Sequence, residues 1–175
     1  MALPPVTPAD ERASLRLRPA TMDDADALLE LRNEPTTRHW SLDGARIPRA
    51  HHVAWLERRL AAPQECRIWV AEVDGEVVGQ ARMDALGSGT GEISVGLAPA
   101  ARGRGLGGRL IREATARGIA ELGLREVAAV IKPDNAASIR AFERAGYGEP
   151  RTITRVGAQV LVLTHRSAAG DDPEV

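Results

Sequence analysis

The chain has 175 residues, of which 43% are hydrophobic and 27% charged, and its formal net charge at pH 7 is −1. This length is typical of one globular domain, which buries roughly 70% of its unfolded surface and needs neither disulfides nor a structural metal. The near-neutral charge argues against nucleic-acid or acidic-membrane partners. The single cysteine excludes an intrachain disulfide and a cysteine-based zinc site. No apolar run approaches the ~20 residues that cross a bilayer.

The two ends of the chain differ in composition from the rest. Residues 1–13 are rich in proline and charge, and residues 167–175 are small and acidic, so we expect disordered tails around a single domain at 14–166. The first residues lack the apolar segment of a secretory signal, which favours a cytoplasmic protein without membrane contact.

The first part of the domain predicts a short strand and two helices. Residues 15–19 alternate between apolar and polar and predict the strand. Thr21, followed three positions later by an aspartate, forms a capping-box pattern that opens the first helix. Its expected buried stripe is Met22, Ala25, Leu28 and Leu29. The stretch 32–47 predicts irregular chain, and Pro48 is placed to start the second helix, whose expected buried residues are Val53, Leu56 and Leu60.

A hairpin and an alternation of strands and helices follow. Asp74-Gly75 lies between apolar runs at 67–73 and 76–83, which is a strong signal for two antiparallel strands. The next expected elements are a strand at 92–97, a helix from Leu106 to Leu122, a strand at 127–131, a helix opened by Asn135 and a strand at 160–165. The continuous apolar run 127–131 predicts a strand covered on both faces.

This order predicts an α/β fold of the mixed, α+β kind. We expect a mainly antiparallel sheet of six to seven strands flanked by about four helices. The strand–helix–strand unit 92–131 predicts one parallel crossover.

Residues 97–110, LAPAARGRGLGGRL, carry few side chains that could build a core. The first N–H groups of a helix lack internal partners and form a positive end with the helix dipole. Glycine allows a phosphate to approach this end closely, and arginines add charge-assisted hydrogen bonds. The stretch therefore predicts a diphosphate site built from Arg102, Gly103, Arg104, Gly105, Gly107 and Gly108.

Two other phosphate-binding patterns fit this stretch less well. The Walker pattern requires Gly-Lys-Ser/Thr, which is missing here. The dinucleotide pattern G-x-G-x-x-G is present at Gly103, Gly105 and Gly108, but five residues separate it from the preceding strand and only 67 residues follow. The later strand ends in Ile131-Lys132-Pro133, without the acidic residue that would hold a ribose.

Two motifs carry a resemblance to a known family. Arg102-x-x-Gly105-x-Gly107, preceded by Leu97-Ala98-Pro99, resembles the acetyl-CoA signature of the GNAT superfamily of N-acetyltransferases, and residues 133–147, PDNAASIRAFERAGY, resemble the second half of that pattern. The resemblance covers residues 15 to about 166. It implies acetyl-CoA as co-substrate, no metal, and an acetyl transfer to an amine.

The resemblance also implies roles for particular residues. Backbone groups of Val95, Gly96 and Leu97 would pair with the pantetheine arm, and residues 103–108, including Leu106, would hold the diphosphate. Asn135 matches a position that contacts the coenzyme, although asparagine is also a good helix N-cap. Phe142 stands where many members have a tyrosine that acts as general acid, so no general acid is identified; Tyr147 matches a packing position.

A general base is expected because only a neutral amine attacks a thioester. For a lysine-like amine, about one molecule in a thousand is neutral near pH 7, a cost of about 4 kcal/mol. Glu92, on the strand that leads into the glycine-arginine stretch, resembles a catalytic glutamate of some family members and is our candidate base. The alternative is a carboxylate on the surface.

The acceptor would enter beside the first two helices and their connection. This region is rich in polar and aromatic groups, and its candidate substrate-binding residues are Arg32, Asn33, Arg38, Trp40 and His52. His51 and His52 are adjacent and point to different helix faces, which argues against a shared metal. The region also resembles, more weakly, a GNAT branch that acetylates nucleotide-linked amino sugars in pseudaminic-acid-type pathways.

Several functions stay open at this point. The predicted function is transfer of an acetyl group to a primary amine of a small molecule. The alternatives are a protein N-terminal or lysine acetyltransferase and a non-catalytic acyl-CoA-binding regulatory module. The family resemblance is also compatible with a homodimer.

Overall fold

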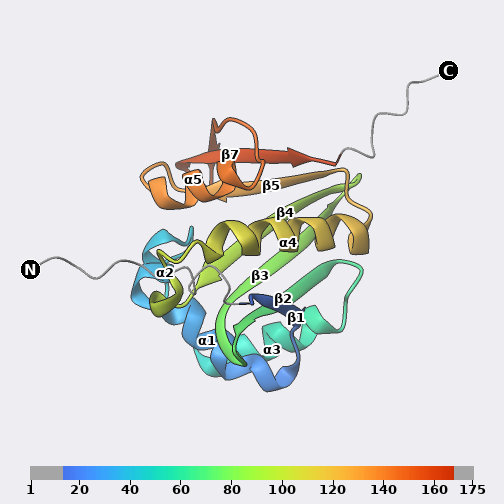
Figure 1. The fold of residues 1–175 in the computed structure, drawn as a ribbon, viewed down its shortest axis with the longest axis vertical. Coiled ribbons are helices and arrows are strands. Elements are labelled where there is room, and N and C mark those ends of the chain that lie inside the picture. Colours follow the sequence, from blue (N-terminus) through green and yellow to red (C-terminus); the bar gives the residue numbers. More distant parts are fainter. Residues whose placement is uncertain (1–13, 168–175) are drawn as a thin grey trace, which may run out of the picture.

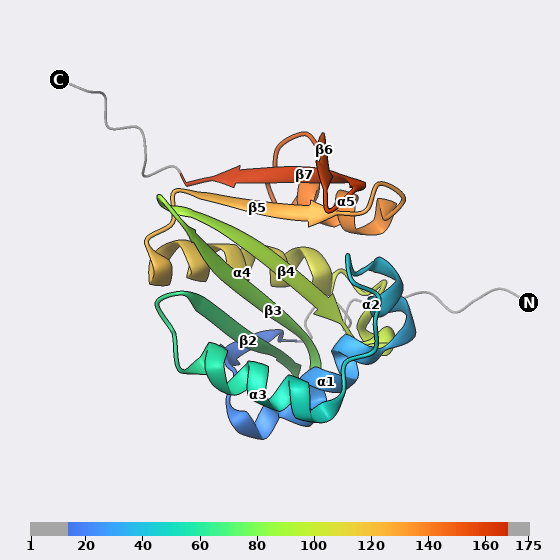
Figure 2. The same ribbon diagram turned by 180° about the vertical axis from the view of Figure 1, so that it is seen from behind.

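The computed structural model describes residues 14–167 as one seven-stranded sheet with helices on both faces (Figures 1 and 2). The tails expected at 1–13 and 167–175 lie outside the described residues, except for Ser167. Among residues 14–167, no helix is long and apolar enough to cross a membrane.

The elements follow one another along the chain as in Figure 1. The strands are β1 (Arg16–Pro19), β2 (Cys66–Val73), β3 (Glu76–Gly87), β4 (Thr90–Leu97), β5 (Glu126–Ile131), β6 (Arg151–Arg155) and β7 (Ala158–Arg166). The helices are α1 (Ala25–Asn33), α2 (Pro35–Trp40), α3 (Arg49–Leu60), α4 (Leu106–Leu122) and α5 (Ala136–Arg144), with short 3-10 turns at η2 (Met22–Asp24) and η3 (Pro99–Ala101).

The strand order is β1-β2-β3-β4-β5-β7-β6, and within this sheet only β4 and β5 pair in parallel. The crossover between them is α4, as the strand–helix–strand unit predicts. The mixed, mainly antiparallel sheet is confirmed. It has seven strands, and the described residues form five α-helices, one more than expected.

Two apolar clusters lie on opposite faces of the sheet. Helices α4 and α5 cover one face, where Met83, Leu110 and Val127 are fully buried. Helices α1 and α3 cover the β2 side of the other face, around Leu28, Leu56 and Val70. Figure 2 shows that α1 and α3 stop short of β5 and β7, so the second face of those strands is left open.

Two expectations about burial are wrong. Strand β5 alternates between buried and half-buried residues, so its apolar run is covered fully on one face only, because no helix reaches the second face. Met22 lies in the 3-10 turn before α1 and is exposed, whereas Leu31 of α1 is buried. The capping box at Thr21 starts a 3-10 turn, which rotates the following helix relative to the expected stripe.

The stretch expected to be irregular contains the short helix α2. Pro35 occupies its first turn, and the Glu34 carboxylate accepts hydrogen bonds from the backbone N–H groups of Thr36 and Thr37 at 3.0 and 2.8 Å. A side chain that caps the first N–H groups stabilises a helix start. None of the residues of α2 is buried, which is why its apolar pattern gives no helical signal.

Candidate active site

The coenzyme side of the site starts where β4 and β5 separate. Their parallel pairing ends at Ile93 and Ala129, although β4 continues to Leu97. Figure 2 shows the two strands diverging toward α2 and α5. The predicted pantetheine residues, 95–97, occupy the part of β4 that has left β5, while they stay paired with β3. Their contact with the coenzyme stays a prediction.

The glycine-arginine stretch forms the start of α4. Gly103 and Gly105 have φ values of +74° and +73°, which a residue with a Cβ adopts only at a cost. Gly105 is the N-cap, and no side chain caps this end of the 17-residue helix. The N–H groups of Leu106, Gly107 and Gly108 have no partner in the helix, because the first turn lacks preceding carbonyls.

This helix start fits a diphosphate. A Cβ added at Gly103 or Gly105 would meet no heavy atom within 4 Å, so open space borders both residues. Such an end attracts anions through free N–H groups and the helix dipole. The predicted ligands 103–108 therefore lie together on one turn.

Arg102 differs from the expectation. Its side chain points back into the protein: Nε donates to Leu97 O at 3.1 Å, and Nη2 donates to Glu34 Oε2 at 2.7 Å and to Thr37 Oγ1 at 3.2 Å. The guanidinium thus joins the coenzyme turn to the start of α2. Arg102 is the largest cause that lowers the pKa of Glu34 to about 2.

The C-terminal end of α2 is also held by a hydrogen bond, from the segment that follows β5. Lys132, directly after β5, donates from Nζ to His39 O at 2.7 Å. Since α2 has no buried residue, these polar contacts at its two ends fix its position between the acceptor side and the coenzyme side. The sequence alone predicted no role for Glu34 or Lys132. Glu34 before Pro35 was the available signal, because an acceptor followed by proline is typical of a helix start.

The second motif provides a helix cap and core packing. The Asn135 side chain accepts a hydrogen bond from Ser138 N at 3.2 Å, which confirms its N-cap role. Phe142 is buried in the core and meets Tyr147 edge to face, with ring centroids 4.9 Å apart. Tyr147 shares a buried 2.7 Å hydrogen bond with Thr115, and burial raises the pKa of its phenol. The structure gives both rings a packing role, and contact of Asn135 or Phe142 with the coenzyme stays a prediction.

Glu92 lies one residue before the point where β4 leaves β5. Its neighbour Ile93 is buried under α4, so Glu92 faces the open side of the sheet. The carboxylate is 23% exposed and accepts a hydrogen bond at 2.7 Å from Arg155 Nη1, on the β6–β7 hairpin. Glu92 lies on the strand that leads into the glycine-arginine stretch, as expected for the candidate base. Its ion pair with Arg155 was not predicted from the sequence.

Two of the five predicted acceptor residues have structural roles instead. His52 is 4% exposed, packed beside Trp55, and burial lowers its pKa, so its prediction as an acceptor contact is wrong. The orientation of α3 is the reason: His52 lies on its buried face and His51 on its exposed face. The Asn33 amide donates to and accepts from the backbone of Ile47 at 2.9 and 2.8 Å, which anchors the loop before α3.

The other three predicted acceptor residues are half-buried and lie on α1 and α2. Arg32 donates from Nη2 to Asp43 O at 2.6 Å, and Arg38 from Nε to Gly44 O at 3.0 Å. Trp40 meets His39 edge to face at 4.5 Å. Arg38 and Trp40 belong to helix α2 and not to the loop that the sequence suggested.

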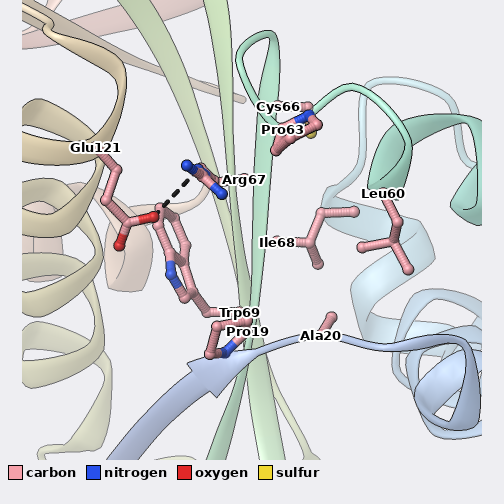
Figure 3. Close-up of a pocket in the computed structure, with 9 residues that line it drawn as sticks. All are labelled: Pro19, Ala20, Leu60, Pro63, Cys66, Arg67, Ile68, Trp69 and Glu121. Carbon is pink, nitrogen blue, oxygen red and sulfur yellow. Dashed lines mark ion pairs between the residues drawn. The ribbon is translucent and has the colours of Figure 1, made fainter.

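A cavity of about 170 Å³ lies away from this site, at the edge of β2 beyond the end of β1 (Figure 3). Figure 3 shows the Arg67–Glu121 ion pair, 3.1 Å long, on one side of it, with Ile68 and Leu60 on the other. Its lining includes Glu121, near the end of α4 opposite the glycine turn, and none of the predicted site residues, so we assign no catalytic role to it. Among residues 14–167, no three His, Cys, Asp or Glu side chains are grouped to hold a metal.

Comparison with known proteins agrees with this geometry. Residues 14–148 match the model of the acetyltransferase (GNAT) domain family. No sequence among the curated proteins matches the chain.

Solved structures share the fold over most of both chains. The aminoglycoside acetyltransferase AAC(6')-Ib, solved with paromomycin and acetyl-CoA, has a TM-score of 0.78 at 22% identity, covering 93% of this chain and 98% of its own. The ribosomal-protein-alanine N-acetyltransferase of Brucella melitensis has 0.75 at 28%, covering 87% and 99%. The yncA protein of Salmonella typhimurium, solved with its cofactor acetyl-CoA, has 0.69 at 25%, covering 87% and 94%.

The family match spans most of the chain, from the residues just before β1 through α5 and the four residues that follow it, and includes the turn at the start of α4. The fold and the positive-φ glycine turn agree with that match independently. The chain therefore belongs to the GNAT acetyltransferase family, which confirms the sequence prediction of an acetyl-CoA-dependent N-acetyltransferase.

Proposed function

We propose that the protein transfers the acetyl group of acetyl-CoA to a primary amine of a small molecule, by direct attack within a ternary complex. The observation that carries the proposal is the uncapped, glycine-rich start of α4 beside the part of β4 that has left β5, with Glu92 at the divergence. We expect the amine to approach from the face of the sheet opposite α4, on which Glu92 lies.

The coenzyme would be held mainly by backbone groups. The N–H groups of residues 103–108 bind the diphosphate, and the edge of β4 at 95–97 pairs with the pantetheine arm. When bound, acetyl-CoA supplies an activated acetyl group as a thioester. A backbone N–H of Val95 or Leu97 would stabilise the carbonyl oxygen as charge develops on it.

Glu92 would take the proton that the amine loses. The amine nitrogen forms a bond to the acetyl carbon, the carbon–sulfur bond breaks, and the proton passes to Glu92, directly or through water. Arg155 holds this carboxylate at 2.7 Å and thereby fixes its direction. Phe142 cannot donate a proton, so the leaving thiolate takes its proton from solvent.

A second candidate, acetylation of a protein N-terminus, is supported by the name of the Brucella melitensis neighbour. The small-molecule proposal is supported by AAC(6')-Ib, which was solved with the aminoglycosides paromomycin and ribostamycin. Nucleotide-linked amino sugars belong to the same proposal, since they present a primary amine on a small molecule.

The test is release of free coenzyme A thiol with a panel of amines: amino acids, amino sugars, nucleotide-linked amino sugars, polyamines and N-terminal peptides. We expect turnover with at least one small-molecule amine, and a fall of at least tenfold in kcat for Glu92→Gln with acetyl-CoA binding retained. Turnover only with peptides would favour the second candidate. Tight acetyl-CoA binding without thiol release for any amine would identify a non-catalytic binding module.

A further inference from the structure

Three arginines from three different elements come together on the acceptor side of the sheet. They are Arg32 in the last turn of α1, Arg38 on α2 and Arg82 on β3. Burial is the largest cause that lowers the pKa of Arg32; the nearby Asp43 charge raises it, and the charges of Arg38 and Arg82 lower it further. Like charges repel one another, so a group of this kind costs free energy in the absence of a negative partner.

Among the described residues, two of the three guanidinium groups lack a carboxylate within ion-pair distance. Arg32 and Arg38 donate to backbone carbonyls, Asp43 O and Gly44 O, which carry no net charge. Within residues 14–167, neither forms an ion pair with a carboxylate at 4 Å or less. Arg82 donates to Asp84 at 2.8 Å and lies over the Trp55 ring, 5.7 Å from its centroid.

Arg32 also has a donor without an acceptor. Its Nη1 is buried and meets no hydrogen-bond partner among the described residues. A buried donor left unpaired costs about 1–3 kcal/mol, and more when the group is charged. Sites that bind ligands retain such a cost when the ligand supplies the missing acceptor.

The acidic groups that face this cluster are already engaged. Asp84 pairs with Arg82 and, at 3.5 Å, with Arg59. Glu92 is held by Arg155, and the Asp43 side chain accepts a hydrogen bond from Ala45 N at 2.9 Å. The three arginines thus face two nearby carboxylates, Asp43 and Asp84, and Asp84 is shared with Arg59, so positive charge remains in excess.

The cluster lies beside the reacting end of the site. Arg82 pairs across the sheet with Ser94, two residues after Glu92, and both side chains alternate onto the open face. Arg38 is on α2, whose start is tied to the coenzyme turn through Arg102. An acceptor with its amine near Glu92 would thus have its next groups near the arginines.

We propose that Arg32, Arg38 and Arg82 bind an oxyanion, a carboxylate or phosphate, on the same molecule whose amine is acetylated. This inference rests on the proposed function and names its substrate class: amines that also carry a negative charge. Hydrogen bonds between guanidinium and an oxyanion are roughly twice as strong as bonds to neutral carbonyls, so the anion displaces the carbonyls of residues 43 and 44. A polycationic acceptor meets repulsion here.

The experiment compares acceptors that differ only in the anion. One pair is an amino acid and its amide, and the other is an amino sugar phosphate and the uncharged amino sugar. We expect the anionic member to have at least a tenfold higher kcat/KM, with the ratio falling as salt rises from 20 to 500 mM because salt screens exposed charges. Preference within the first or second pair distinguishes a carboxylate from a phosphate.

Variants then assign the preference to the cluster. Arg32→Gln is expected to raise KM for the anionic acceptor at least tenfold, leave KM for its neutral partner within twofold and leave acetyl-CoA affinity unchanged. Arg166→Gln is the control, since it removes one charge from the far end of β7, where Arg166 pairs with Glu126. Arg166→Gln should leave the anionic-to-neutral ratio of kcat/KM unchanged for both acceptor pairs.

Two outcomes would overturn the inference: equal use of anionic and neutral partners by the wild-type protein, or an unchanged preference in a folded Arg32→Gln. If Arg32→Gln does not fold, the wild-type ratio and its salt dependence decide alone. Failure of the proposed function gives a different result, acetyl-CoA binding without thiol release for any acceptor.

Discussion

Gly107→Ala should separate coenzyme binding from folding. Gly107 lies in the first turn of α4, and a Cβ added there would be 3.7 Å from Leu97 Cδ1, an ordinary van der Waals distance. Alanine therefore fits the folded protein, and replacing glycine by alanine within a helix stabilises it by about 0.5–1 kcal/mol. For a domain of this size we expect Tm to rise by about 1–4 °C.

The same methyl group should weaken acetyl-CoA binding. It would stand between the start of α4 and Leu97, where we expect the coenzyme to pass from its diphosphate to its pantetheine arm. We expect the dissociation constant for acetyl-CoA to rise at least tenfold, a loss of about 1.4 kcal/mol. Isothermal titration calorimetry gives the affinity, and a thermal melt without ligand gives the stability.

Gly118→Ala in the same helix should show the opposite pattern. There the added Cβ would lie 2.6 Å from Met83 Cε and 2.9 Å from its Cγ, in a fully buried part of the core. Overpacking of this kind costs about 1–3 kcal/mol, so Tm falls while acetyl-CoA affinity is retained. Wild-type affinity in a folded Gly107→Ala would refute the placement of the coenzyme at this turn.

Three further predictions concern residues that the structure brought into view. Glu34→Gln should weaken acetyl-CoA binding and lower Tm, most strongly above pH 5. The pKa of Glu34 is about 2 in the folded protein, below its ordinary value of 4.5, so the stabilisation from this carboxylate is lost as pH falls from 4.5 toward 2. The Tm values of the wild-type protein and the variant should therefore converge in thermal melts from pH 7 to 3. In His52→Gln, Tm should fall less between pH 7 and pH 5 than it does in the wild-type protein. Burial lowers the pKa of His52 in the folded protein, so the unfolded chain binds the proton at a higher pH than the folded one. An equal fall of Tm in both proteins would contradict this. Val156→Asn should raise Tm, by about 2–4 °C for each kcal/mol added to the free energy of unfolding. Val156 is 97% exposed with φ +50°, and an Asn-Gly pair suits this two-residue hairpin turn. An unchanged kcat is the check that the hairpin is intact.

The elements that the sequence predicted correctly depend on local interactions. Asp74-Gly75 forms the β2–β3 turn, with positive φ at both residues, as a two-residue hairpin requires. Asn135 caps α5 through a residue three positions away. The glycine turn before α4 was equally predictable, because its φ values and its free N–H groups are properties of the turn itself.

The features that the sequence did not predict depend on contacts between distant segments. Glu34 and Arg102 are 68 residues apart, and Glu92 and Arg155 are 63 apart, so no pattern within one window joins them. His52 shows the same limit on a smaller scale. Spacing placed it on α3, but the packing of α3 against α1 determined whether it faced the acceptor or the core.

Helix α2 links the two halves of the proposed reaction. It contributes no buried side chain, so hydrophobic packing does little to hold it. Its start is held by Arg102 from the coenzyme turn and its end by Lys132 from the β5–α5 connection, at 2.7 Å each. Arg38, which we propose as a contact of the acceptor's anion, lies between these two anchors. If Arg38 binds the acceptor, the segments that we propose for the coenzyme also set the position of the acceptor group, as direct transfer in a ternary complex requires.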